Sequence, residues 1–164
     1  MGLVLSWDAA REYRERWKAE GRAVVLTNGL FDLLHLGHVD YLQRARRLGD
    51  ALIVGLNGDE SARRLKGPER PIVPAAERAA ILAALSCVDG VVIFEADTAE
   101  ELVRALRPDV YVKGGDWSPE TGRQPPEAAV AQAAGGRVVY LPYLPEHSTS
   151  ALIQTILERY GRRT

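Results

Sequence analysis

Short apolar runs rich in valine, leucine and isoleucine recur along the chain, separated by longer amphipathic stretches. The runs lie at 23–27, 51–56, 91–94, 110–112 and 137–141. Each run is continuously apolar and does not alternate with polar residues, as expected of strands that are covered on both faces. The pattern therefore predicts five parallel β-strands.

The stretches around these runs have apolar residues at helical spacing and residues typical of helix ends. They predict helices at 6–20, 39–48, 74–86, 98–106, 126–134 and 148–160. Thr98 and Glu101 have the spacing of a capping box. The alternation predicts an α/β fold: a single Rossmann-like domain whose five-stranded parallel sheet has helices on both faces. We expect an N-terminal helix within residues 1–21 to pack on a domain formed by residues 22–164.

Polar residues, glycines and two histidines gather where these strands would end. The longest such segment, residues 27–38, reads Thr-Asn-Gly-Leu-Phe-Asp-Leu-Leu-His-Leu-Gly-His and joins the first run to the next helix. Open α/β sheets bind their ligands at the carboxyl ends of the strands. The distribution therefore favours a ligand site at this edge of the sheet.

The segment 27–38 combines features that suit a polyphosphate. Gly29 lets the backbone approach a ligand, and Gly37 lets the chain turn tightly into a helix whose N-terminus attracts anions. His35 and His38 place two imidazole donors there, where negative charge would build up on an attacked phosphorus. The alternatives are two incidental histidines or a metal pair. We predict no metal bound directly by side chains, because no Cys pair or nearby acidic cluster supplies further ligands.

Other strand ends carry further candidates. Lys113 can reach a phosphate of the attacked polyphosphate or of the molecule that attacks it, the acceptor. Alternatively it is a solvated loop lysine. The hydroxyls of Ser148, Thr149 and Ser150 open the last helix and can bind the leaving phosphates, while Ser148 also caps the helix.

The segment after the second run offers a contact region for the acceptor. Asn57 and Asp59 can bind hydroxyls of an acceptor or form an Asx turn. Four cations follow in a segment expected to be a loop, at Arg63, Arg64, Lys66 and Arg70. We expect Lys66 to face the polyanion, and Arg63 and Arg64 to form a solvated face.

Composition excludes several classes of function. The formal net charge is −1, which gives no general attraction to nucleic acid or to anionic membranes. One cysteine, Cys87, excludes an internal disulfide and a cysteine-based zinc site. The apolar stretches are too short to span a bilayer, and the residues before Asp8 lack the apolar core of a secretory signal. We therefore expect a cytoplasmic protein.

The His-x-Gly-His pattern after a strand ending in a Thr-x-Gly-x-Phe-Asp-type turn resembles the nucleotidylyltransferase superfamily, and within it the cytidylyltransferase-like branch. Further segments at 55–59, 63–71, 109–117 and 148–152 are similar to the D-glycero-β-D-manno-heptose 1-phosphate adenylyltransferases, so the resemblance extends over residues 22–160. The chain departs from their usual pattern at three positions. Leu30 stands in place of Cys, Gly58 in place of Ser, and His147 in place of Tyr.

The resemblance implies that AMP is transferred from ATP to a sugar 1-phosphate in the presence of Mg²⁺, with release of pyrophosphate. It implies that His35, His38 and Lys113 act in catalysis and that the protein is a homodimer. The nucleotide would contact Thr27, Asn28, Gly29, Phe31, Gly37, Gly114, Asp116, Ser148, Thr149 and Ser150. The second substrate would contact Asp32, Asn57, Asp59 and Lys66, with Asp32 ordering the turn or the metal.

Two other functions fit the same residues. A cytidylyltransferase acting on glycerol 3-phosphate or a similar alcohol phosphate would share the fold and the histidines, and nothing physical in the sequence distinguishes adenine from cytosine. A nucleotide-sensing module without catalysis is the second alternative. A sensor has no need of donors at an attack site, so the presence of His35, His38 and Lys113 argues against it.

Overall fold

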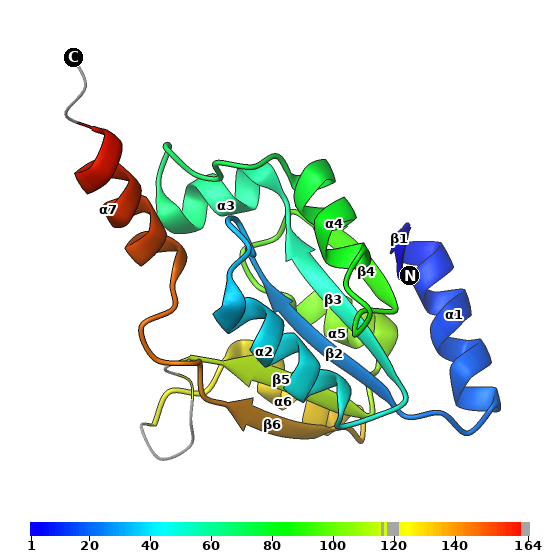
Figure 1. Cartoon of the computed structure of the whole chain (residues 1–164). Coiled ribbons are helices and arrows are strands. Elements are labelled where there is room, and N and C mark those ends of the chain that lie inside the picture. Colours follow the sequence, from blue (N-terminus) through cyan, green and yellow to red (C-terminus); the bar gives the residue numbers. More distant parts are fainter. Residues whose placement is uncertain (116, 118–121, 162–164) are drawn as a thin grey trace.

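The computed structural model describes residues 1–115, 117 and 122–161. One parallel sheet runs through it in the order β1-β4-β3-β2-β5-β6 (Figure 1). Its strands are β1 (Leu3–Leu5), β2 (Val24–Gly29), β3 (Ala51–Asn57), β4 (Gly90–Phe94), β5 (Val110–Gly114) and β6 (Arg137–Leu141). The predicted α/β fold with a parallel sheet is confirmed, but the sheet has six strands and not five.

The additional strand is β1, which pairs in parallel with β4 from Leu3 opposite Gly90 to Leu5 opposite Val92. It was missed because it is only three residues long and lies at the edge of the sheet, where Leu3 and Val4 remain about half exposed. A strand of this length has no periodicity from which it can be predicted.

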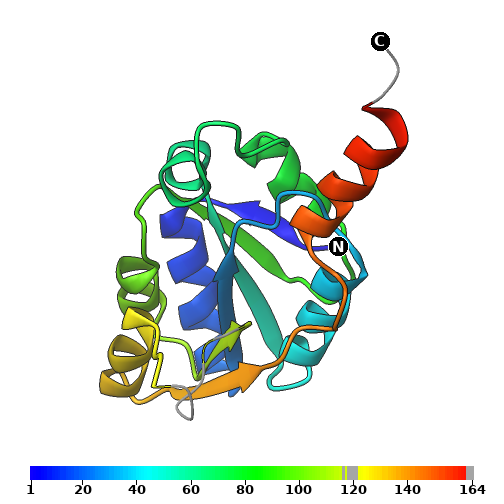
Figure 2. The same cartoon turned by 90° about the vertical axis from the view of Figure 1, so that its left-hand side faces the viewer.

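Helices cover both faces of the sheet (Figure 2). One face packs against α1, α5 and α6, and the other packs against α2 and α4. The helices are α1 (Trp7–Ala19), α2 (Leu36–Arg46), α3 (Asp59–Lys66), α4 (Ala75–Ala83), α5 (Glu100–Leu106), α6 (Pro126–Ala133) and α7 (Thr149–Tyr160).

The N-terminal segment is part of this structure and not an appendage. Ser6 caps α1 by accepting a hydrogen bond from the backbone N–H of Ala9. Trp17 is buried against the sheet, and the buried Arg14 donates to the carbonyl oxygen of Leu106. Because β1 also joins the sheet, residues 1–21 share a hydrophobic core with the rest of the chain.

Two local predictions were wrong. The segment with Arg63, Arg64 and Lys66 was expected as a loop, but these residues belong to α3, which is favoured by acidic residues in its first turn and basic residues in its last turn. The capping box of Thr98 and Glu101 does not form. Ala99 occupies the N-cap position of α5, and its backbone N–H donates to Glu127. The Thr98 hydroxyl donates instead to Glu100.

The last helix, α7, projects from the body of the molecule in both views (Figures 1 and 2). None of its residues is buried, although its sequence is amphipathic. Ile156, Leu157 and Tyr160 are each at least half exposed. Within the described residues, no helix has the length and apolar character needed to cross a membrane.

Candidate active site

A cavity of about 520 Å³ lies at the carboxyl ends of β2, β3 and β5. Most of the predicted site residues line it: Asn28, Gly29, Phe31, Asp32, His38, Asn57, Lys66, Lys113, Gly114, Ser148, Thr149 and Ser150. The lining does not include Thr27, His35, Gly37 or Asp59, and Asp116 is outside the described residues. The structure thus gathers side chains from four distant segments of the sequence around one cavity.

A second hollow, of about 400 Å³, is formed between α5 and α6. It is lined by Arg104, Arg107 and small apolar residues, and it contains none of the predicted site residues. We therefore place the candidate site in the first cavity.

The turn from β2 into α2 is held in an unusual backbone conformation. Phe31 has a φ of 46°, in the left-handed region that non-glycine residues rarely adopt. Its buried ring lies edge-on to His38, with centroids 5.1 Å apart. A Cβ on residue 29 would lie 3.0 Å from the Phe31 ring, so glycine gives this ring its space. The conformation fixes the backbone at the cavity wall.

The two histidines of the motif stack against each other at the start of α2. Their ring centroids are 3.7 Å apart and their planes differ by 22°. Both ring nitrogens of His35 and Nδ1 of His38 are buried without a hydrogen-bond partner among the described residues. Unpaired buried ring nitrogens are costly, so this arrangement is expected to gain partners when a ligand binds.

The environment of the histidines favours their neutral form. Burial lowers the pKa of His38 to about 4, assisted by the neighbouring His35 and opposed by the backbone of Leu33. Burial also lowers the pKa of His35, with a further contribution from His147. Each ring can then donate one hydrogen bond, and a bound polyphosphate would favour uptake of a second proton.

Gly37 is required by close packing at this turn. A Cβ at this position would lie 2.9 Å from the Cβ of His147 and 3.1 Å from the His35 ring. The loop before α7 therefore packs directly on the start of α2. Through this contact His147, which stands where the related sequences usually have Tyr, lies close enough to lower the pKa of His35.

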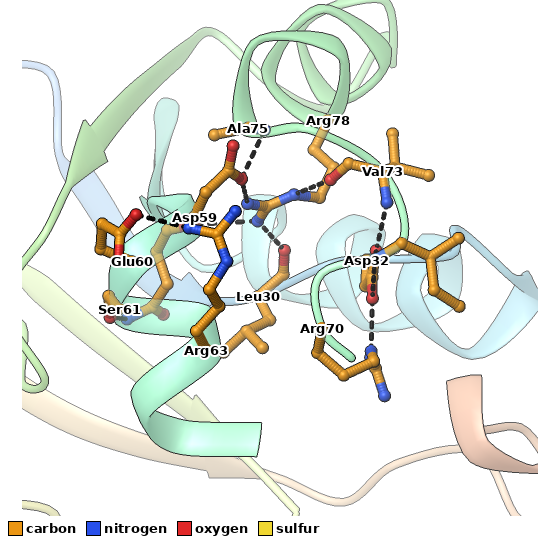
Figure 3. A network of polar contacts seen from close by, with 12 residues as sticks. Leu30, Asp32, Asp59, Glu60, Ser61, Arg63, Arg70, Val73, Ala75 and Arg78 are labelled. Carbon is orange, nitrogen blue, oxygen red and sulfur yellow. Dashed lines mark hydrogen bonds and ion pairs between the residues drawn. The ribbon is translucent and has the colours of Figure 1, made fainter. Parts of the chain in front are cut away.

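Asp32 is a buried carboxylate whose hydrogen-bonding capacity is used within the protein (Figure 3). It accepts from the backbone N–H groups of Ile72 and Val73 and from Nε of Arg70, at 2.5 Å. Burial by itself would raise the pKa of Asp32, but these donors outweigh it and the pKa is lowered. Asp32 thereby holds Arg70 at the cavity wall.

A second ion pair, in which only the arginine is buried, fixes the start of α3 and α4 (Figure 3). The fully buried Arg78 donates to the carbonyl oxygens of Leu30, Asn57 and Val73, and it pairs with Asp59 at 2.8 Å. Asp59 also accepts from the backbone N–H of Ala75. Asp59 therefore connects α3 with α4, and Arg78 extends this network to the β2–α2 turn. Neither residue is part of the cavity lining.

Lys113, at the end of β5, is mostly buried and its Nζ donates to Oδ1 of Asn28 at 3.1 Å. The Tyr111 hydroxyl donates to the same oxygen at 2.6 Å. Thr27 is fully buried, and its hydroxyl bonds with that of Tyr41. The polar side chains of β2 are thus tied to neighbouring strands and helices.

The cations of α3 lie on two sides of the helix, the protein surface and the cavity. Arg63 pairs with Glu60 and Arg64 with Asp97 on the surface, whereas Lys66 lines the cavity. Asn57 is buried beneath them and donates to the hydroxyl of Ser61. Lys66 and Arg70 are the cations from this segment that reach the cavity.

The N-terminus of α7 closes another wall of the cavity. The Ser148 hydroxyl accepts from the backbone N–H of Ala151, which makes Ser148 the N-cap, as predicted. Thr149 and Ser150 line the cavity in the first turn of the helix. A helix start with free N–H groups attracts anions.

Sequence reasoning missed two charged residues of this region, the buried Arg78 and Glu127, and it named Arg70 among four cations without choosing it for the cavity. Each looks like an ordinary surface charge in the sequence. A weak signal was available for Arg70, which follows Lys66 closely in a proline-flanked segment. Glu127 interrupts an alanine-rich helix, but nothing in its local sequence predicts burial.

The site offers several hydrogen-bond donors and few acceptors that could bind a metal. No group of three or more His, Cys, Asp or Glu side chains suited to a metal ion occurs in the described part of the chain. The arrangement can bind an anionic ligand and neutralise charge that develops on it.

Residues 26–154 match the cytidylyltransferase-like family. The bifunctional protein HldE of Syntrophotalea carbinolica is 52% identical over 93% of this chain and 31% of its own length. The HldE of Trichlorobacter lovleyi is 53% identical over 87% of this chain and 28% of its own length. The chain spans less than a third of these curated relatives.

A solved structure shares the fold. The lipopolysaccharide core biosynthesis protein from Thermoplasma volcanium superposes with a TM-score of 0.61 at 26% identity, covering 76% of this chain and 98% of that one. The family match covers most of the chain and includes the histidine motif and the walls of the cavity. The chain belongs to the cytidylyltransferase-like family.

Proposed function

We propose that this protein is an adenylyltransferase, which transfers AMP from ATP to a sugar 1-phosphate and releases pyrophosphate. The acceptor we propose is D-glycero-β-D-manno-heptose 1-phosphate. The observation that carries the proposal is the convergence of His38, Lys113, Lys66 and the start of α7 on one cavity. These groups suit a triphosphate together with a second phosphate.

In this proposal the protein positions and neutralises the reactants and forms no covalent intermediate. A phosphate oxygen of the sugar attacks the α-phosphorus in line, a bond to the sugar phosphate forms, and pyrophosphate leaves with the electron pair of the broken bond. His35 and His38 donate to the triphosphate, and Lys113 neutralises the charge that develops at the α-phosphorus. The start of α7 binds the leaving phosphates.

The nature of the acceptor rests on similarity. The segments shared with heptose 1-phosphate adenylyltransferases extend along the chain, its relatives carry the name HldE, and the solved neighbour is named for lipopolysaccharide core biosynthesis. Within the cavity, Asn57 and the cations Lys66 and Arg70 would contact the sugar phosphate.

Magnesium would enter as the complex with ATP. The described residues provide no cluster of metal ligands, and the oxygens of Asp32 already accept from Ile72, Val73 and Arg70. Mg²⁺ frequently binds through substrate phosphates and keeps several waters, which agrees with such a site. The cation would neutralise the phosphates that the histidines and Lys113 do not reach.

The proposed assembly is a homodimer that works in the cytoplasm, where ATP is available. The exposed apolar side chains of α7 provide surface for association. Light scattering at micromolar protein should give about twice the chain mass of 18.0 kDa. A mass near that of one chain would refute the dimer.

Pyrophosphate release tests the function directly. ATP, CTP, GTP and UTP are each combined with a panel of sugar 1-phosphates and alcohol phosphates, and each is also tested alone. We expect release only with ATP and a sugar 1-phosphate together. A preference for CTP of about tenfold or more, roughly 1.4 kcal/mol in the barrier, would instead indicate an alcohol-phosphate cytidylyltransferase. Nucleotide binding without any turnover would indicate a sensing module.

A further inference from the structure

Glu127 is a buried carboxylate at the wall of the candidate active site. It lies in the first turn of α6 and is 2% exposed. Its Oε1 accepts a hydrogen bond from the backbone N–H of Ala99, at the start of α5, at 2.8 Å. Its Oε2 is buried with no hydrogen-bond partner among the described residues and lies 3.8 Å from Nζ of Lys113. Only one of its two oxygens is therefore needed for the structure of α5.

The position of Lys113 requires a counter-charge. Its side chain is 14% exposed, and burial lowers its pKa, whereas Glu127 raises it. An ammonium that is removed from water loses its proton unless an opposite charge lies near it. Within the described residues, the hydrogen bond from Nζ goes to Asn28, whose amide oxygen supplies a partial charge only.

The other described groups around Lys113 do not provide that charge. Tyr111 on β5 is kept neutral because burial and Glu127 raise its pKa. Burial also raises the pKa of Tyr140, the residue of β6 that lies opposite Lys113. The Trp117 ring, which lies 5.7 Å from Nζ, also stacks with the Arg123 guanidinium. Asp97, elsewhere in the cavity lining, is paired with Arg64. In the described part of the chain, Glu127 is the carboxylate that faces Lys113.

We propose that Glu127 is the positioning residue for Lys113: its carboxylate keeps the ammonium charged and holds it at the wall of the cavity. At 3.8 Å the pair is an ion pair without a hydrogen bond, so it leaves N–H groups of Lys113 available. One N–H of Nζ points to Asn28, and the others can be donated to a phosphate oxygen. The role in transfer rests on the proposed function, but the coupling of the two charges does not.

The titration of Lys113 can be measured without any turnover. The chain has three lysines, at positions 18, 66 and 113, so a protein labelled with ¹³C at lysine Cε gives a simple spectrum with two internal references. Glu127→Gln removes the charge and keeps an oxygen that can accept from Ala99. We expect the pKa of Lys113 to fall by about 1–3 units in this variant, while Lys18 and Lys66 do not move.

The matched control is Glu101→Gln on the neighbouring helix α5. Glu101 is exposed and pairs with Arg104 on the surface, so the variant removes an equal charge without changing the cavity. Lys113 should titrate there as in the wild type. A Lys113 titration that stays unchanged in Glu127→Gln, with or without a lower melting temperature, would show that Glu127 serves only the start of α5 and would overturn the proposal.

The pH profile of pyrophosphate release connects the coupling to catalysis. The alkaline limb of kcat/KM should move to lower pH in Glu127→Gln, because the ammonium is lost earlier. Adding Lys113→Arg to Glu127→Gln should restore activity at alkaline pH, since arginine stays protonated. A wild type without turnover would refute the proposed function but would leave the NMR result standing.

If Glu127→Gln does not fold, Glu127→Asp decides the question. This variant keeps the negative charge but places it about one methylene farther from Nζ of Lys113, so the pKa of Lys113 should again fall, by less than when the charge is removed. An unchanged Lys113 titration in folded Glu127→Asp would contradict the proposal.

Discussion

Among the predicted catalytic residues, His38 has the strongest support, and the effect of its surroundings on its function can be tested. Its ring lines the cavity, packs edge-on against Phe31 and stacks on His35. Its Nδ1 is buried and, among the described residues, unpaired. The packing fixes the direction of the ring before a ligand arrives, which is what a preorganised donor requires.

Replacing His38 should affect the rate more than the fold. Loss of one preorganised donor to a developing charge costs about 10²–10³ in rate, or roughly 2.7–4 kcal/mol. His38→Ala should lower kcat by that order, and His38→Asn, which keeps a donor of shorter reach, should lose less. Steady-state kinetics and thermal melting of the three proteins test this. A variant that melts several degrees lower yet remains fully active per folded molecule would assign His38 to the core.

His38 should also make stability depend on pH in the acidic range. Its pKa is about 4 in the folded protein, lowered by burial from 6.5. As the pH falls from 6.5 to 4, the unfolded chain takes up a proton and the folded chain does not, so stability declines over that interval. Above pH 6.5 both states are neutral and this contribution vanishes.

The comparison of wild type with His38→Asn isolates that contribution. Melting temperatures between pH 7.5 and pH 4 should fall more steeply for the wild type, because the variant has no proton to take up at this position. Parallel curves for the two proteins would contradict the low pKa of His38.

One departure from the family pattern has a structural account at the same scale. A Cβ on Gly58 would lie 1.9 Å from Oε1 of Glu95. The other oxygen of Glu95 accepts from the backbone N–H of Ser61, in the first turn of α3. The carboxylate thus occupies the space that a side chain at position 58 would need, and it accepts from a backbone N–H that an N-cap side chain could otherwise bind.

At the scale of elements, local patterns in the sequence predicted most of the strands and helices. The apolar runs predicted β2 to β6, and the strand ends predicted where the cavity lies, because parallel strands bring their carboxyl ends to one edge. It missed β1, which is too short to have a pattern, and α3, whose arginine-rich sequence beside glycine and proline suggested a loop. Both depend on contacts or end effects that a count of apolar positions does not include.

The buried charges were beyond local prediction for a related reason. Arg78 is buried because the β2–α2 turn and the end of β3 present carbonyl oxygens to it. Glu127 is buried because α5 begins beside it. The carbonyl oxygens of Leu30 and Asn57 and the N–H of Ala99 come from positions 48, 21 and 28 residues away in the sequence, so neither helical spacing nor residue type reveals these contacts.

The formation of α3 gives the role of Lys66 a clear test. Lys66 and Arg63 lie on the same helix and are both exposed, but Lys66 lines the cavity whereas Arg63 pairs with Glu60. Lys66→Ala should lower kcat/KM roughly tenfold, since a charge-assisted hydrogen bond contributes about 1.5 kcal/mol at the lower end of its range. Arg63→Ala, the matched control, should leave kcat/KM unchanged. Equal effects in the two variants would assign Lys66 to the solvated face.

At the scale of the whole molecule, the N-terminal elements and the cavity occupy different parts of the sheet. The cavity lies at the carboxyl ends of the central strands and is lined in part by residues of α2, α3 and α7. The first two elements, β1 and α1, lie at the edge and on one face of the sheet, and no residue of theirs lines the cavity. The N-terminal segment should therefore support the fold without taking part in the reaction.

Removing residues 1–21 should test this separation. The deletion removes the buried Trp17 and Ala10 and the hydrogen bonds of Arg14 to Leu106 and Arg107, and it uncovers apolar side chains of α5. Burying one large apolar side chain stabilises by about 1.5–3 kcal/mol, so the melting temperature should fall by about 10 °C or more. Deleting residues 1–5 alone removes only the edge strand and should cost less. Pyrophosphate release per folded molecule should match the full chain in both truncated proteins, and a truncated protein that keeps its melting temperature but loses activity would place the segment in the site instead.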